Sequence, residues 1–139
     1  MTPVTVKVEI EVPLERIVNC IVGFCESPYS PWAKSFLPTQ SAEGLLEQLP
    51  EAEPGIWYST ETYWRNAEGK ASLTYDDPNE PEGTFGASVT IGLTALTNGL
   101  NIMATKAPSH FADLIKENDD AITHDVFMQM VVFGEIIYG

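Results

Sequence analysis

The hydrophobic period of this chain changes at Pro13, and this change limits how the chain can begin to fold. Before Pro13, apolar residues alternate with polar ones, which predicts a half-buried strand; the apolar positions are Val4, Val6, Val8, Ile10 and Val12. Proline's fixed φ suits the first turn of a helix. Beyond it, apolar residues recur at helical spacing, at Leu14, Ile17, Val18, Ile21, Val22 and Cys25. The sequence therefore predicts a strand over 4–12 that packs against a helix.

Prolines, glycines and aromatic residues divide the middle of the chain into short elements. The prolines of residues 27–32 remove backbone donors and fix φ, so these residues should be irregular, within a loop over 26–40. Aromatic and β-branched residues favour a strand at 56–64. In order, we expect a short helix from Ser41 to about Leu49, the strand at 56–64, a turn at 66–69, the returning strand of a hairpin at 70–75, an exposed loop at 76–86 and a third strand at 87–91.

The last third of the chain has helical spacing. Its expected helices run from a Thr94 cap to about Lys106, from a Ser109 cap to about Ile115, and over 122–133, with a polar break at 118–120 and Gly134 at the end. Residues 135–138 fit either a short strand or an extended tail, docked on its own domain or on a second copy. The grouping of strands apart from helices predicts one α+β domain over 1–139, with an antiparallel sheet of three or four strands and four or five helices on one face.

The net charge of −13 restricts the partners of this chain. Such a surface repels phosphate backbones and anionic membranes, so we expect neither direct nucleic-acid binding nor membrane binding. Residues 43–82 alone carry −8, with ten acidic and two basic residues. Two interpretations remain open, a soluble surface with no basic partner and an acidic surface for a basic protein. The candidate acidic residues are Glu43, Glu47, Glu51, Glu53, Asp76, Asp77, Glu80 and Glu82.

The two cysteines fit an intracellular protein. Cys20 and Cys25 are five residues apart on the expected first helix, which turns them about 140° away from each other and disfavours a disulfide. We therefore expect reduced thiols. The N-terminus lacks a basic start followed by an apolar run, so we expect no signal peptide. No apolar stretch approaches the length of a membrane span.

Aromatic residues are the main candidates for binding. On a strand, Trp57 and Tyr63 would share one face, and Tyr58 and Trp64 the other. Both faces of a one-sided sheet cannot be equally buried, so one pair should be partly exposed or covered by segment 26–40 or another subunit. The candidate binding residues are Tyr29, Trp32, Trp57, Tyr58, Tyr63, Trp64 and Arg65.

Catalytic and metal motifs have little support. A metal site with His110, Asp113 and His124 as ligands, together with nearby aspartates, is conceivable, but it matches no standard ligand spacing. The acids of 76–82 do not fit a twelve-residue calcium loop. Cys25 as a nucleophile would lie at a helix C-terminus, where the dipole does not stabilise a thiolate. We expect no cofactor and no catalysis.

The C-terminal third carries a resemblance. It reads Gly99-Leu100, Ile102-Met103-Ala104, Lys106, Pro108, His110-Phe111-Ala112-Asp113, then Glu117–Ala121, Thr123, Asp125–Phe127, Gln129 and Phe133–Gly139. This pattern over Gly99–Gly139 resembles a widespread group of small uncharacterised bacteriophage proteins. The resemblance implies a role in the cytoplasm of an infected bacterium.

These features predict a non-catalytic, phage-encoded acidic binding protein that neutralises a host factor with a basic surface, such as a bacterial defence system. The alternatives are a sponge for a small signalling nucleotide, held by Trp57, Trp64 or Arg65, a small metal-dependent enzyme around His110, Asp113 and His124, and a virion or assembly component. A homo-oligomer is a further expectation, because the apolar run at the C-terminus needs a surface to dock on.

Overall fold

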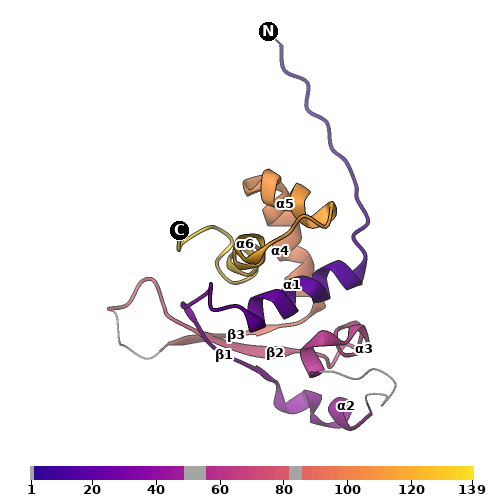
Figure 1. The fold of residues 1–139 in the computed structure, drawn as a ribbon, viewed down its shortest axis with the longest axis vertical. Coiled ribbons are helices and arrows are strands. Elements are labelled where there is room, and N and C mark those ends of the chain that lie inside the picture. Colours follow the sequence, from indigo (N-terminus) through magenta and orange to yellow (C-terminus); the bar gives the residue numbers. More distant parts are fainter. Residues whose placement is uncertain (1, 49–55, 82–85) are drawn as a thin grey trace.

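The protein has an α+β fold, as the sequence predicts, in which helices cover one face of an antiparallel sheet (Figure 1). The computed structural model describes residues 2–48, 56–81 and 86–139. Its elements are α1 (Leu14–Glu26), β1 (Ala33–Pro38), η1 (Gln40–Ala42), α2 (Glu43–Gln48), η2 (Trp57–Ser59), α3 (Glu61–Arg65), β2 (Ala71–Tyr75), β3 (Ala87–Ile91), α4 (Leu93–Lys106), α5 (Pro108–Ile115) and α6 (Ala121–Phe133).

The sheet has the order β1-β2-β3, with β2 antiparallel to both neighbours. Its register places Leu73 of β2 between Phe36 of β1 and Val89 of β3. These three side chains belong to the core, while Leu37 and Thr90 at adjacent positions are exposed. One face of the sheet is therefore apolar and the other is open, as expected for side chains that alternate between the two faces of a strand. The register of β1 is irregular between Ala33 and Ser35.

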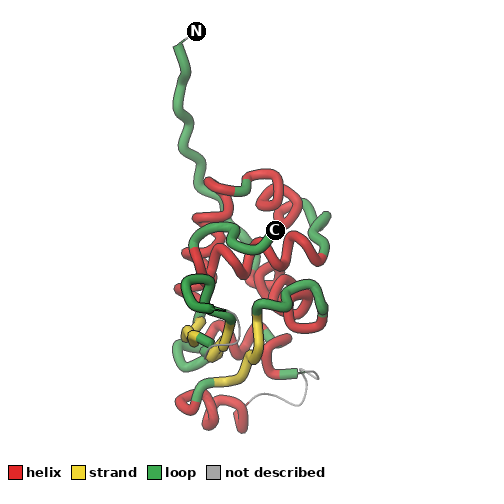
Figure 2. The backbone as a smooth tube through the Cα atoms, turned by 90° about the vertical axis from the view of Figure 1, so that its left-hand side faces the viewer, coloured by secondary structure: helices red, strands yellow, loops and turns green. Residues whose placement is uncertain are grey.

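The longer helices form a layer on the apolar face of the sheet. In Figure 1, α1, α4, α5 and α6 lie on one side of the strands, and α2 and α3 lie near one end of them. Figure 2 shows the same separation of helical and strand layers from the side. The helices α4 and α6 approach closely at Gly99, where an added Cβ would lie 2.3 Å from the Val131 side chain. The core therefore lies between this helical layer and the sheet.

The helix α6 has the ends that the sequence predicts. The Asp120 carboxylate caps its first turn by accepting hydrogen bonds from the backbone N–H groups of Ile122 and Thr123, both at 3.0 Å. Gly134 ends it with φ 72°, in the left-handed region that glycine adopts without strain. The cap at Thr94 is wrong, because α4 begins at Leu93 with Gly92 before it. The cap at Ser109 is also wrong, because Ala107 precedes α5 and Pro108 occupies its first turn.

The strand predicted at 4–12 is wrong. Residues 2–13 have no regular secondary structure and extend away from the domain (Figure 1). A strand needs hydrogen bonds from a neighbour, and no described strand pairs with this segment. Most of its apolar side chains therefore stay exposed, with exposed fractions of 85% for Val4 and 53% for Ile10. Val12 is partly buried against the core, and together with Val8 and Ile10 it lines a groove of about 220 Å³ beside α4.

Two predictions in the middle of the chain need correction. Residues 27–32 are irregular, as predicted, but residues 33–38 of the expected loop form β1, because an edge strand tolerates the missing donor of Pro38. Residues 56–64 form η2 and α3 instead of a strand, so β1 and not this segment pairs with β2. Burial of Tyr63 and Trp64, both 0% exposed, outweighs their preference for strands.

Candidate functional sites

The aromatic candidates separate into core and partly exposed residues. Trp32, Tyr63 and Trp64 are buried, Trp57 and Tyr58 are half-buried, and Tyr29 is 47% exposed. Phe36, from the segment predicted to cover the aromatics, stacks on Trp57 and Trp64 with ring centroids 5.5 and 6.3 Å apart. The Trp64 indole N–H also donates to the Tyr58 carbonyl at 2.9 Å. Most of this cluster is therefore a packed part of the core.

The buried carboxylate of Asp125 organises the segment after α1. It accepts hydrogen bonds from the Ser30 hydroxyl at 2.5 Å, the Trp32 indole N–H at 2.8 Å and the Gln129 amide at 2.7 Å. Asp125 and Trp32 are 6% and 3% exposed. The sequence did not indicate this role, because Ser30 and Trp32 lie 95 and 93 residues away from Asp125.

Gln129 connects the same network to the C-terminal tail. Its side-chain oxygen accepts from the backbone N–H groups of Ile137 and Tyr138 at 2.8 and 2.9 Å, and its amide donates to the Tyr138 carbonyl. The Tyr138 ring lies parallel to Trp32, with centroids 6.2 Å apart. The tail therefore docks on its own domain as an extended segment. Asp125, Gln129 and Tyr138 thus meet in one network.

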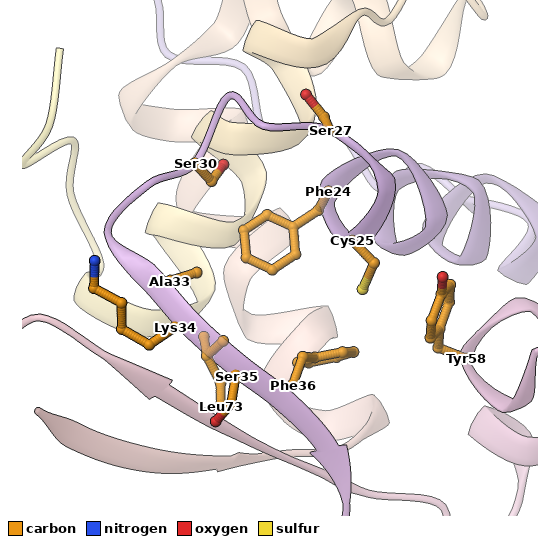
Figure 3. A pocket seen from close by; sticks show the side chains of 10 residues that line it. All are labelled: Phe24, Cys25, Ser27, Ser30, Ala33, Lys34, Ser35, Phe36, Tyr58 and Leu73. Atoms are coloured by element: carbon orange, nitrogen blue, oxygen red, sulfur yellow. The ribbon is translucent and has the colours of Figure 1, made fainter.

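A small pocket lies between the end of α1 and β1 (Figure 3). Its volume is about 280 Å³, below the usual size of a ligand site. Cys25 and Tyr58 lie at one end of it, with Phe24 and Phe36 between α1 and the strand. Burial, and less strongly Glu26, raises the pKa of the Cys25 thiol to about 12, so this thiol is protonated at neutral pH and is a poor nucleophile.

A larger groove of about 620 Å³ lies beside the start of α4. Arg65 and Lys70 line it, together with Asn66, Asn98 and the first residues of α4. Arg65 pairs with Glu61 at 3.5 Å and remains 66% exposed. Trp64 forms part of the wall but is fully buried, and Trp57 does not line the groove. The groove therefore brings two cations together without an exposed ring for stacking.

The candidate acidic residues that the structure describes form two patches. Glu43 and Glu47 are exposed on α2, which follows the end of β1, while Asp76, Asp77 and Glu80 follow the end of β2. Because β1 and β2 are antiparallel, these ends point in opposite directions. Of these five residues, Asp76 forms an ion pair with Lys34 at 3.4 Å. Glu51, Glu53 and Glu82 lie outside the described residues.

The histidines do not form the metal site considered from the sequence. His124 Nε2 lies 2.6 Å from Asp119 Oδ2, and Cys20 completes a cluster with this pair. In the part of the chain that the structure describes, His110 and Asp113 belong to no such cluster, and His110 Nδ1 is buried without a hydrogen-bond partner. Cys20 was not considered as a ligand, because nothing in the sequence places α1 beside residues 119–124.

Comparisons with known proteins do not identify a function for this chain. The chain matches no family model, no curated protein and no solved structure. Among the described residues, no helix is long and apolar enough to span a membrane.

Proposed function

We propose that this chain is a phage-encoded acidic binding protein that neutralises a host factor, such as a component of a bacterial defence system, in the cytoplasm of the infected bacterium. The observation that carries the proposal is the extended segment before α1. Four of its aliphatic side chains are strongly exposed, at 85% for Val4, 74% for Val6, 71% for Val8 and 53% for Ile10. A contiguous apolar row in solvent is typical of a surface that a partner covers.

The pattern of this segment suggests how it would bind. Its period of two suits strand addition, in which backbone groups pair with the edge of a partner's sheet and alternate side chains fill pockets. The two acidic patches favour a partner with a basic surface and would speed the encounter. Phosphate backbones would be repelled by the same charge, so a protein is the better partner. The mode of action is contact and not catalysis.

Affinity capture from bacterial lysate, using the full-length protein tagged at its C-terminus, tests this proposal. Four paired variants are compared with the unmodified protein: V4S/V6S in the exposed segment, E43K/E47K on α2, D77K/E80K after β2, and E15K/E135K as a control with the same charge change as each acidic pair. We expect one host protein that V4S/V6S no longer captures and that at least one acidic variant captures less well, especially at high salt.

The control variant separates a specific contact from general attraction. If E15K/E135K weakens capture as much as the other charge variants, the acidic patches have no specific role. If V4S/V6S captures the same host protein with unchanged affinity, the exposed segment is not the contact and the proposal fails.

A nucleotide sponge is a second candidate, and the groove beside α4 favours it. Arg65 and Lys70 are two of only seven basic residues, and they line one groove of a strongly acidic protein. Cations of this kind hold phosphate groups. Isothermal titration with cyclic mono- and dinucleotides tests it, with R65Q/K70Q as the variant and K106Q as the control. Binding that survives R65Q/K70Q, or no binding at all, contradicts this candidate.

A further inference from the structure

Three side chains that can bind metals meet where α1 crosses the start of α6. Cys20 belongs to α1, Asp119 to the connection between α5 and α6, and His124 to the first turns of α6. One potential ligand atom from each, a sulfur, a carboxylate oxygen and a ring nitrogen, lies within 4.8 Å of the other two. Residues about a hundred positions apart thus converge on one point.

The cluster is buried at its base and open at its rim. Cys20 is 0% exposed, whereas the side chains of Asp119 and His124 are 18% and 14% exposed. An ion held by the three side chains would therefore have protein on the thiol side and solvent within reach of the other two ligands. This arrangement leaves room for a water molecule as a further ligand.

Gly23 allows the imidazole ring to lie at this point. A Cβ added at Gly23 would lie 2.1 Å from His124 Nδ1, which no side chain could tolerate without displacing the ring. Gly23 follows Cys20 by three residues, so both positions are on the same face of α1. The hydrogen bond of 2.6 Å to Asp119 then fixes the ring from the other side.

The chemistry of this set selects among metals. A thiolate favours zinc and other soft or borderline ions over magnesium and calcium, and imidazole and carboxylate are regular zinc ligands. Tetrahedral zinc with bonds of about 2.0–2.3 Å places its ligand atoms roughly 3.5 Å apart. The three atoms lie within 4.8 Å of one another, so the Cys20 sulfur would move inward by no more than about 1.3 Å. His124 Nε2 and Asp119 Oδ2, 2.6 Å apart, would separate by about 0.9 Å as two metal bonds replace their hydrogen bond.

We propose that Cys20, Asp119 and His124 bind one zinc ion in tetrahedral geometry, with water as the fourth ligand. The ion would connect α1 to the start of α6, two elements that are distant in the sequence. The thiol proton leaves when the thiolate binds the metal. This site lies apart from the exposed N-terminal segment, so its presence or absence does not decide the proposed host-binding function.

Cobalt substitution tests the site directly. The full-length protein is stripped with a chelator and titrated with Co²⁺, which reports a thiolate ligand by a charge-transfer band and tetrahedral geometry by intense visible bands. We expect both signals to saturate at one Co²⁺ per chain and to disappear when Zn²⁺ is added. If neither signal appears in the folded protein, the proposal is overturned.

Paired variants identify the ligands. C20S should lose the charge-transfer band, while C25S, which changes the other thiol of the same helix, should keep it. H124Q and D119N should weaken Zn²⁺ binding by more than the roughly 10- to 100-fold that loss of an outer hydrogen-bond partner costs, with H110Q as the control. Circular dichroism establishes which variants fold. If C20S does not fold, D119N at its partly exposed position still decides, because unchanged affinity and spectrum in folded D119N would overturn the site.

Discussion

Replacing Asp125 with alanine should strongly destabilise the protein, because one carboxylate holds three segments together. The change removes the acceptor of the buried Trp32 indole N–H and one acceptor of the Gln129 amide. Each buried donor left unpaired costs about 1–3 kcal/mol, and the Ser30 hydroxyl also loses its bond. Alanine regains about 0.5 kcal/mol through its higher helix propensity. We therefore expect a loss of about 3 kcal/mol in the free energy of unfolding.

Urea unfolding followed by tryptophan fluorescence measures this loss, and a thermal melt should show a midpoint about 10 °C lower. The control is D113A on α5, whose half-buried carboxylate has no side-chain hydrogen bond or ion pair among the described contacts. It makes the same change of residue type in a helix and should shift the free energy by no more than about 0.5 kcal/mol.

The isosteric variant D125N tests whether the network or the packing is responsible. Asparagine keeps one oxygen for Trp32 but presents an NH2 group to the Gln129 amide, which cannot reverse without losing its bonds to Ile137 and Tyr138. We expect a loss of about 1–2 kcal/mol and faster hydrogen exchange at the two tail amides. If D125A costs less than about 1 kcal/mol, or no more than D113A, the network does not hold these segments and the reasoning is wrong.

Three further predictions concern packing, thiols and the exposed segment. G99A should lower the free energy of unfolding by about 1–3 kcal/mol, because its Cβ would collide with α6. G44A, whose Cβ would have no atom within 4 Å, should raise the free energy of unfolding by about 0.5–1 kcal/mol. Equal effects of the two variants in urea unfolding would contradict the close packing at Gly99. In the metal-free protein, burial raises the pKa values of Cys20 and Cys25 to about 12 from 9.0. Their contribution to stability is therefore present below pH 9 and is lost as the pH rises towards 12. Both thiols of the metal-free protein should react slowly with a thiol reagent at pH 8, and rapid labelling in the native state would refute this. Deletion of 2–9 should change the free energy of unfolding by less than about 1 kcal/mol, and a larger loss would show that the segment packs on the domain.

The predictions that held depend on local physics. The helix after Pro13, the strands at 71–75 and 87–91, and the ends of α6 follow from periodicity, a carboxylate cap and a glycine. Each of these signals acts between neighbours in the chain, so it can be found without knowing the tertiary structure. The α+β class follows from the order of these elements.

The candidate sites depend on which segments meet, and this information is not local. The alternation at 4–12 indicates that a strand could form. It does not indicate whether a neighbouring strand is present to pair with this segment. The aromatic run at 57–64 has the composition of a strand, yet burial of its rings against Phe36 turns it into short helices.

The sequence by itself determined the charge of this protein, its fold class and the position of most of its helices, because these depend on composition and on contacts within a few residues. Only the tertiary structure decided that the acidic residues divide into two patches and that Cys20 lies beside Asp119 and His124. It also decided that Asp125 binds the segment after α1 and that Gln129 binds the tail. The physical reason is that strand pairing and helix packing choose partners across many residues, and no single segment carries that choice.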